Sequence, residues 1–322
     1  MAQHPKTGHR VIALSGGVGG AKLALGLSRV LPPGDLTVIA NTGDDFEHLG
    51  LSISPDLDTL LYTLAGLDNP ETGWGRRDES WHFMAALEAL GGETWFRLGD
   101  KDLATHVERT RRLRAGETLS QITDDFRGRL GIATRILPMS DDPVRTRVRA
   151  AEGWLDFQDY FVRHQCQPPI SAIEFRGASE ARPQPEFLAA LSEPALRAVI
   201  ICPSNPFISI EPILALPGVR AALRSCAAPV VAVAPIIGGR AVKGPTAKMM
   251  TELGLNPSAA AIGRRYGNLI DAYIVDRADA GSCAGFNRAT VAVKALMENL
   301  ADREALASTV LQAADRASEP VS

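Results

Sequence analysis

A glycine-rich segment near the N-terminus has the composition of a phosphate-binding loop. Residues 15–22 read SGGVGGAK and stand between apolar runs at 11–14 and 23–27. Glycine has no Cβ atom, so backbone N–H groups here can approach a phosphate closely, and a helix starting here adds the partial positive charge of its N-terminus. Close packing of a helix on a sheet is the alternative use of such glycines. We predict that a nucleotide diphosphate contacts Gly16, Gly17, Gly19, Gly20 and Lys22.

The loop matches neither of the two common nucleotide-binding fingerprints. A Walker A motif requires glycine at the position of Ala21 and serine or threonine at the position of Leu23. The pattern G-x-G-x-x-G, started at Gly17, requires glycine where Lys22 stands. The sequence therefore supports neither a P-loop ATPase nor a standard dehydrogenase.

Two acidic segments follow the next apolar run, NTGDD at 41–45 and SPDLDT at 54–59. Carboxylate oxygens next to a diphosphate are the ligands that Mg²⁺ requires, and we predict Asp45 and Asp58 as the metal-binding and catalytic pair. The second segment also has the pattern of a helix start. The alternative is therefore that Asp56 and Asp58 only complement the helix dipole.

Two further loops follow apolar runs. In PSNP, at 203–206, Ser204 and Asn205 either cap a helix or hydrogen-bond a nucleotide at the carboxyl edge of a sheet. The second loop, at 236–249, contains Gly238 and Gly239 and several cations. These cations either neutralise phosphates or are solvated loop charges.

Residues 95–106, WFRLGDKDLATH, mix aromatic, cationic and acidic side chains. His106 is a candidate general base, although a lone histidine on a helix is more often a surface or core residue. The arginines that follow it are expected to form a solvated helix face: Arg109, Arg111, Arg112 and Arg114.

The elements that must position these residues alternate between strands and helices. Continuous apolar strands such as 230–234 indicate burial on both faces, which is typical of a parallel sheet covered by helices. Residues 78–165 are charged and mostly helical in pattern, with a possible hairpin near Gly153, and we interpret them as an insertion or cap. We predict a single α/β domain over residues 1–322 with a mainly helical insertion at about 78–165.

Composition limits the class of protein. The 322 residues include 34 Lys and Arg against 37 Asp and Glu, a formal charge of −3, which argues against a strongly basic nucleic-acid-binding protein. Four widely spaced cysteines form no C-x-x-C pair, so zinc is not expected. Residues 1–10 are polar and the first apolar run is too short for a signal or membrane helix, so we expect a cytoplasmic protein without membrane contact.

In their order along the chain, these motifs resemble the 2-phospho-L-lactate transferase family. The resemblance runs from residue 11 to about 275 and rests on GGVGGAK, NTGDD, SPDLDT, WFRLGDKDLATH, PSNP and IIGGRAVKGPTAKM. It implies a Rossmann-like, homodimeric enzyme of coenzyme F420 biosynthesis. Such enzymes use Mg²⁺ to move a phospho-three-carbon-acid unit from a guanosine-diphosphate-linked donor to the ribityl hydroxyl of Fo (7,8-didemethyl-8-hydroxy-5-deazariboflavin), releasing GMP.

The resemblance also implies roles for individual residues. Asp58 and Arg97 match positions that contact Fo, with Asp58 near the attacking hydroxyl and Asp45 as its partner on the metal. The glycine loop, Ser204 and Asn205 would hold the guanylyl donor, while the loop at Gly238 and Gly239 would close over the phosphates. The motifs do not distinguish 2-phospholactate, phosphoenolpyruvate and phosphoglycerate as the transferred acid.

Two other classes compete with the transferase. A nucleotide-binding regulatory protein of the related gluconeogenesis-factor family shares the glycine loop, but such proteins carry a segment like ADDGGSSG where this chain has residues 41–45 and 54–59. An NAD(P)-dependent oxidoreductase shares only the order of strand, glycine loop and helix. The acidic segments therefore favour the transferase.

Overall fold

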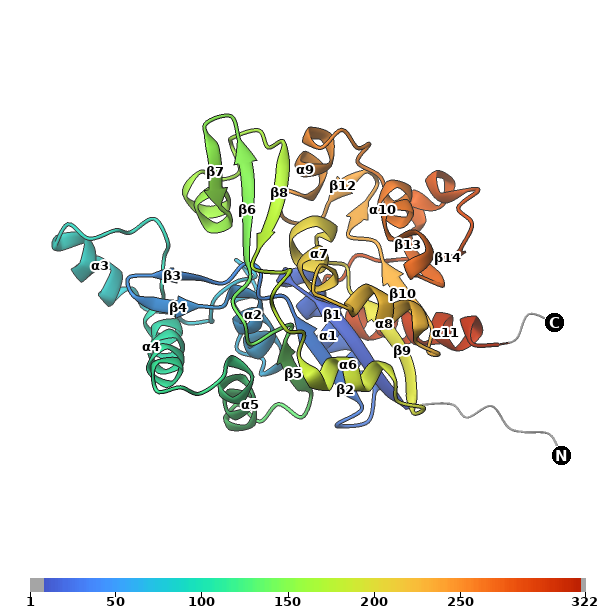
Figure 1. The fold of residues 1–322 in the computed structure, drawn as a ribbon, viewed down its shortest axis with the longest axis horizontal. Coiled ribbons are helices and arrows are strands. Elements are labelled where there is room, and N and C mark those ends of the chain that lie inside the picture. The colour runs from blue at the N-terminus through green and yellow to red at the C-terminus, as the bar shows by residue number, and fades with distance from the viewer. Residues whose placement is uncertain (1–8, 320–322) are drawn as a thin grey trace.

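Seven parallel strands form the central sheet of this computed structural model, which describes residues 9–319. Most of the polar segment at 1–10 therefore lies outside the described residues. In spatial order the strands are β14 (Ala289–Val293), β13 (Ala272–Asp276), β10 (Val230–Val233), β9 (Leu196–Ile201), β1 (Arg10–Ser15), β2 (Leu36–Ala40) and β5 (Arg135–Pro138). The predicted Rossmann-like parallel sheet is confirmed (Figure 1).

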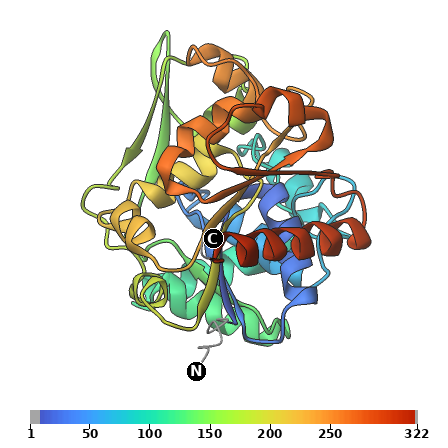
Figure 2. The ribbon, with the colours of Figure 1, turned by 90° about the vertical axis from the view of Figure 1, so that its right-hand side faces the viewer.

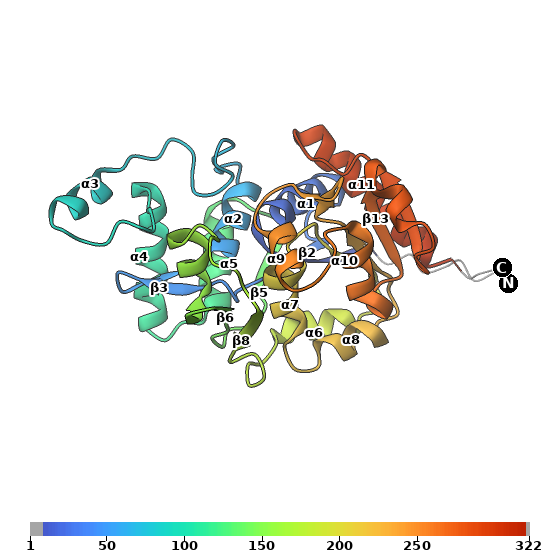
Figure 3. The same cartoon turned by 90° about the horizontal axis from the view of Figure 1, so that it is seen from above.

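Helices cover both faces of this sheet because its strands are apolar on both sides. On β1, Val11 and Ala13 pack under one set of helices, and Ile12 and Leu14 under the other. Figure 3 shows α1 and α11 on one side and α6 and α8 on the opposite side. The first layer is α1 (Gly17–Val30), α2 (Pro55–Leu64), α5 (Leu119–Arg129) and α11 (Leu300–Ala317). The second is α6 (Pro185–Leu191), α7 (Glu211–Leu214), α8 (Val219–Ser225), α9 (Thr246–Glu252) and α10 (Ala259–Tyr266).

Smaller elements extend beyond the sheet. The hairpin of β3 (Phe46–His48) and β4 (Leu51–Ile53) lies with α3 (His82–Ala89) and α4 (Asp100–Arg114) at the left of Figure 1. An antiparallel sheet of β6 (Arg145–Ala150), β7 (Gly153–Asp156) and β8 (Ala172–Arg176) projects at the top of the same view. The remaining elements are η1 (Asp159–Arg163), η2 (Pro206–Ile210), β11 (Ile236–Ile237), β12 (Arg240–Ala241), η3 (Gly267–Leu269) and η4 (Arg277–Cys283). Over residues 9–319, no single helix is both long and apolar enough to cross a membrane.

The segment at 78–165 differs from the mainly helical insertion expected of it. It begins with α3, α4 and α5, but β5 within it is the edge strand of the central sheet and pairs with β2. The hairpin expected near Gly153 is present as β6 and β7. The chain therefore leaves the sheet twice, between β2 and β5 and again between β5 and β9. A strand of only four residues, RILP, is too short for its periodicity to separate these two excursions.

Close packing between α1 and α11 depends on Gly26. The long red helix in Figure 2 is α11, and a Cβ atom at Gly26 would overlap the carbonyl oxygen of its Arg303. Alanine favours a helix over glycine by roughly 1 kcal/mol, but overpacking costs about 1–3 kcal/mol. We expect Gly26→Ala to lower the free energy of unfolding in urea. Gly128→Ala in α5 is the control, because the added methyl group has no atom within 4 Å apart from the backbone of its own helix. Equal effects of the two substitutions would contradict this explanation.

Candidate functional site

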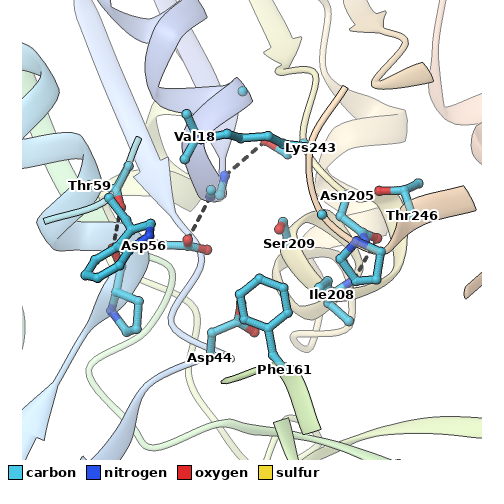
Figure 4. Close-up of a pocket in the computed structure, with 18 of the residues that line it drawn as sticks. Val18, Asp44, Asp56, Thr59, Phe161, Asn205, Ile208, Ser209, Lys243 and Thr246 are labelled. Carbon is cyan, nitrogen blue, oxygen red and sulfur yellow. Dashed lines mark hydrogen bonds between the residues drawn. The ribbon is translucent and has the colours of Figure 1, made fainter. Parts of the chain in front are cut away.

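A cavity of about 800 Å³ opens at the carboxyl edge of the central sheet. Loops that follow β1, β2, β9, β10 and β14 all contribute to its wall. The chain order reverses between β1 and β9, which is where open α/β sheets bind ligands. Figure 4 shows Asp44, Asp56, Ser209 and Phe161 around the shared space.

The glycine loop at the start of α1 packs directly on the loop after β9. The Gly16 N–H donates to Ser204 Oγ at 3.1 Å. A Cβ atom at Gly19 would lie 2.5 Å from the carbonyl oxygen of Pro203, and one at Gly20 would lie 2.5 Å from Ser204 Oγ. Gly19 is therefore required for packing, whatever the loop binds, because the atom that it faces belongs to the backbone. Gly16, Gly17, Gly19 and Ser204 line the cavity, and Gly20 does not.

Asp56 joins the acidic segment to the glycine loop. Its Oδ1 accepts the Gly17 N–H at 2.7 Å (Figure 4), and its Oδ2 accepts the Asn41 side-chain amide at 2.9 Å. Burial raises the pKa of Asp56 to about 6. The carboxylate does more than complement the dipole of its own helix, because it also satisfies an N–H at the start of α1, where helical partners are absent.

Asp44 and Asp45 follow β2 and differ in exposure to the cavity. Asp44 lines it, whereas Asp45 does not and accepts the Ser54 hydroxyl at 2.7 Å. Within residues 9–319, Oδ1 of each carboxyl is buried and has no hydrogen-bond partner. Burial raises the pKa of Asp45 to about 7, and burial together with the neighbouring Asp56 raises the pKa of Asp44 well above its usual value. Unpartnered carboxylate oxygens fit a hard divalent cation such as Mg²⁺.

Asp58 lies at the cavity wall in a buried cluster with side chains of α4. Both of its oxygens accept hydrogen bonds from the Arg109 guanidinium, at 3.0 Å from Nη1 to Oδ2 and from Nη2 to Oδ1. Asp58, Asp102 and His106 offer ligand atoms within 4.8 Å of one another. Asp45 does not belong to this group, although the charge of Asp58 contributes to the raised pKa of Asp45, after burial.

The expectation of a solvated arginine face on α4 is wrong for Arg109, whose side chain is 1% exposed. Arg111 on the same helix is exposed and pairs with Glu108. Arg109 and Asp102 are the functional candidates that the sequence analysis missed. Together with His106 they stand at helical positions i, i+4 and i+7, and that spacing was the available signal.

Aromatic side chains also line the cavity. They include Trp74, Trp95, Phe96 and Phe161, and Trp95 contacts Phe96 edge to face with ring centroids 5.7 Å apart. The guanidinium of Arg97 lies 4.1 Å from the centroid of the Trp81 ring, and Arg97 also lines the cavity. Such a surface suits a planar aromatic molecule.

The remaining predicted residues differ in whether they line the cavity. Lys22 lines it and donates to the carbonyl oxygen of Met297 at 3.0 Å, and burial lowers the pKa of Lys22. Asn205 also lines it and accepts the Phe207 N–H at 2.9 Å, as a helix cap. Gly238 and Gly239 do not line it and form the turn between β11 and β12.

Comparison with known proteins gives the family. The model of the 2-phospho-L-lactate transferase CofD family matches residues 11–313. The chain belongs to this family. Transferase chemistry of the phospholactate type follows from that membership.

Curated relatives of this CofD-family chain carry a more specific name. The phosphoenolpyruvate transferase of Streptomyces griseus is 40% identical over 316 residues, which cover 96% of this chain and 99% of the relative. The phosphoenolpyruvate transferase of Kitasatospora aureofaciens is 43% identical over 92% of this chain and 94% of the relative. The phosphoenolpyruvate transferase of Mycobacterium tuberculosis is 38% identical over 96% of this chain and 98% of the relative. A solved structure of a UPF0052 family member from Bacillus halodurans, 14% identical, matches with a TM-score of 0.63 over 94% of this chain and 99% of its own, and shows the shared fold.

Proposed function

We propose that this CofD-family enzyme transfers a phosphoenolpyruvyl unit from a guanosine-diphosphate-linked donor to the ribityl hydroxyl of Fo in coenzyme F420 biosynthesis. The choice of phosphoenolpyruvate among the three candidate acids rests on the names of the curated relatives. A homodimer remains a prediction from the family resemblance, and a cytoplasmic location remains a prediction from the polar N-terminal residues.

One observation carries the proposal. A single cavity joins the glycine loop, buried carboxylates and an aromatic wall that includes Arg97. The glycine loop suits a guanosine diphosphate group, and the aromatic wall suits a tricyclic deazaflavin. Asp58 lines the same cavity and suits the point at which acceptor hydroxyl and donor phosphorus meet.

The proposed step exchanges one phosphorus–oxygen bond for another. The Fo hydroxyl oxygen attacks the phosphorus that carries enolpyruvate, and the bond from this phosphorus to the oxygen bridging to GMP breaks. GMP leaves with that bridging oxygen and its electron pair. The hydroxyl proton passes to the carboxylate of Asp58, which keeps lone pairs free beside those engaged by Arg109. Positioning and electrostatic stabilisation supply most of the acceleration in such transfers.

We propose Asp45 and Asp58 as the residues that hold Mg²⁺, with Asp44 beside them. The unpartnered Oδ1 of Asp44, which lines the cavity, supports a cation there, and Asp45 has an unpartnered Oδ1 although it does not line the cavity. When bound there, the metal supplies positive charge that offsets the charge of the donor phosphates.

Arg97 provides a test of the acceptor end. Arg97→Ala is expected to weaken Fo binding about 10-fold, because a cation and its stacking surface are removed from the aromatic wall. Affinity for guanine nucleotide should remain within two-fold of wild type, since the glycine loop is untouched. Isothermal titration calorimetry measures both affinities. Equal loss of the two would show that Arg97 does not act at the acceptor end.

The transfer itself is tested by the nucleotide product. The purified protein, Mg²⁺ and the phosphoenolpyruvyl guanosine-diphosphate donor are incubated with and without Fo, and nucleotides are separated by chromatography. We expect GMP to form only when Fo is present. Formation of GMP at the same rate without Fo would indicate a hydrolase, and absence of GMP despite nucleotide binding would favour the regulatory protein.

A further inference from the structure

A polar stripe on α4 faces the helix that carries Asp58. Asp102, His106 and Arg109, which we call the α4 stripe, are spaced so that they share one side of the helix. His106 and Arg109 are buried, and Asp102 and His106 reach the cavity wall. Asp102 accepts the Tyr62 hydroxyl of α2 at 2.6 Å, which ties the stripe to the helix of Asp58.

Arg109 is fixed by several elements at once. Besides its bonds to Asp58, its Nη1 lies 3.4 Å from His106 Nδ1 and 3.5 Å from the carbonyl oxygen of Ser52 in β4. The next residue, Thr110, accepts the Ser52 N–H at 2.7 Å. His106 Nε2 lies 3.2 Å from Asp102 Oδ2 without the alignment of a hydrogen bond. The guanidinium therefore has little freedom to move, and neither has the carboxylate that it holds.

The position of this ion pair indicates a role beyond stability. Removing two charges from water is costly, and apolar replacements of a buried pair are often equally stable. This pair is nevertheless buried, and it lies where Asp58 reaches the cavity. A two-pronged contact with guanidinium sets the plane of a carboxylate more firmly than a single contact does.

We propose that Arg109 is a positioning residue that fixes the orientation of the Asp58 carboxylate toward the acceptor hydroxyl. This inference rests on the proposed function, because the hydroxyl is that of Fo. Arg109 does not itself reach the wall of the cavity, so it acts through Asp58. Its loss should slow the reaction with little change in the binding of either substrate.

The test uses two substitutions and a matched control in the full-length protein. Arg109→Ala removes the contact, and Arg109→Lys keeps the charge without the two-pronged geometry. Arg112→Ala is the control, because Arg112 lies on the same helix and pairs with Glu117 and Asp125 away from the cavity. For each variant, kcat and KM for Fo are measured, and Fo and guanine-nucleotide affinities are determined by calorimetry without turnover.

We expect kcat to fall about 100-fold in Arg109→Ala and about 10-fold in Arg109→Lys, since a small misplacement of a reacting group has effects of this size. The affinities for Fo and guanine nucleotide should stay within about five-fold of the wild-type values. Methylguanidine at millimolar concentration should restore part of the kcat of Arg109→Ala. Arg112→Ala should keep wild-type kcat. The inference is overturned if Arg109→Lys keeps the wild-type kcat. It is also overturned if Arg109→Lys is folded and its affinity for Fo or guanine nucleotide falls as much as its kcat. Failure of the wild-type protein to form an Fo adduct would instead overturn the proposed function.

Discussion

Replacement of Asp58 by asparagine is expected to lower kcat at least 100-fold, because a general base contributes about 10²- to 10⁴-fold to such reactions. Asparagine has nearly the same shape but cannot accept the proton of the Fo hydroxyl. The measurement is steady-state kinetics of GMP formation with saturating donor and Mg²⁺. Affinity for guanine nucleotide measured without Mg²⁺ should change little, since the glycine loop contacts Asp56 rather than Asp58.

Asp58→Asn also leaves the Arg109 guanidinium buried without a charged partner, which costs about 3–5 kcal/mol in comparable cases. The variant is therefore compared with wild type by urea denaturation, and kinetics are measured where both are folded. Asp56→Asn, on the same helix, is the matched control. Its carboxyl binds Gly17 and Asn41, so we expect a higher KM for the donor with kcat nearly unchanged. If Asp58→Asn kept kcat within five-fold of wild type, Asp58 could not be the proton acceptor.

The second large effect is expected from Gly19→Ala. The added Cβ would lie 2.5 Å from the carbonyl oxygen of Pro203, which is backbone and cannot rotate away. The glycine loop and the loop at 203–206 must then separate, and both are proposed to hold the donor. We expect the Kd for guanine nucleotide, measured by calorimetry, to rise at least about 10-fold, because precisely fitted contacts lose this much when backbones shift.

Gly26→Ala provides the control for Gly19→Ala. Both substitutions lie on α1 and both create an overlap with a backbone carbonyl, but the overlap at Gly26 is with Arg303 of α11, away from the cavity. We expect Gly26→Ala to reduce stability while nucleotide affinity stays within two-fold of wild type. An unchanged Kd in Gly19→Ala would show that the loop serves packing alone, which is the alternative that its composition left open.

Much of the site could be predicted because parallel strands end at one edge of a sheet. Strands and glycines are visible in the sequence, so the segments that contain Gly16, Asp44 and Ser204 were expected to meet, and they do. The sequence could not show that Gly19 lies in close contact with the backbone of Pro203, because such a contact depends on the exact positions of two loops that the motifs place only at the same edge. Nor could it show that Asp45 accepts the Ser54 hydroxyl and does not line the cavity.

The arginine run on α4 shows a different limit. In the sequence RTRRLR, at 109–114, every arginine suits a solvated face by composition, and only the packing of α4 on α2 and β4 selects Arg109 for burial. Asp102, His106 and Arg109 share one helical face, but apolar periodicity, the usual guide, does not mark a polar face as buried. The same difficulty applies to β5, whose four residues carry too little pattern to be assigned to the sheet.

Mass spectrometry of the products shows whether this chain transfers a phospho-acid unit to Fo. Purified protein, Fo and Mg²⁺ are incubated in turn with the guanosine-diphosphate-linked forms of phosphoenolpyruvate, 2-phospholactate and phosphoglycerate, and products are identified by mass spectrometry. We predict an Fo adduct carrying the phosphoenolpyruvyl group, formed fastest from the first donor, with one GMP per adduct. Absence of an adduct from all three donors, in a protein that binds guanine nucleotide, would contradict the account.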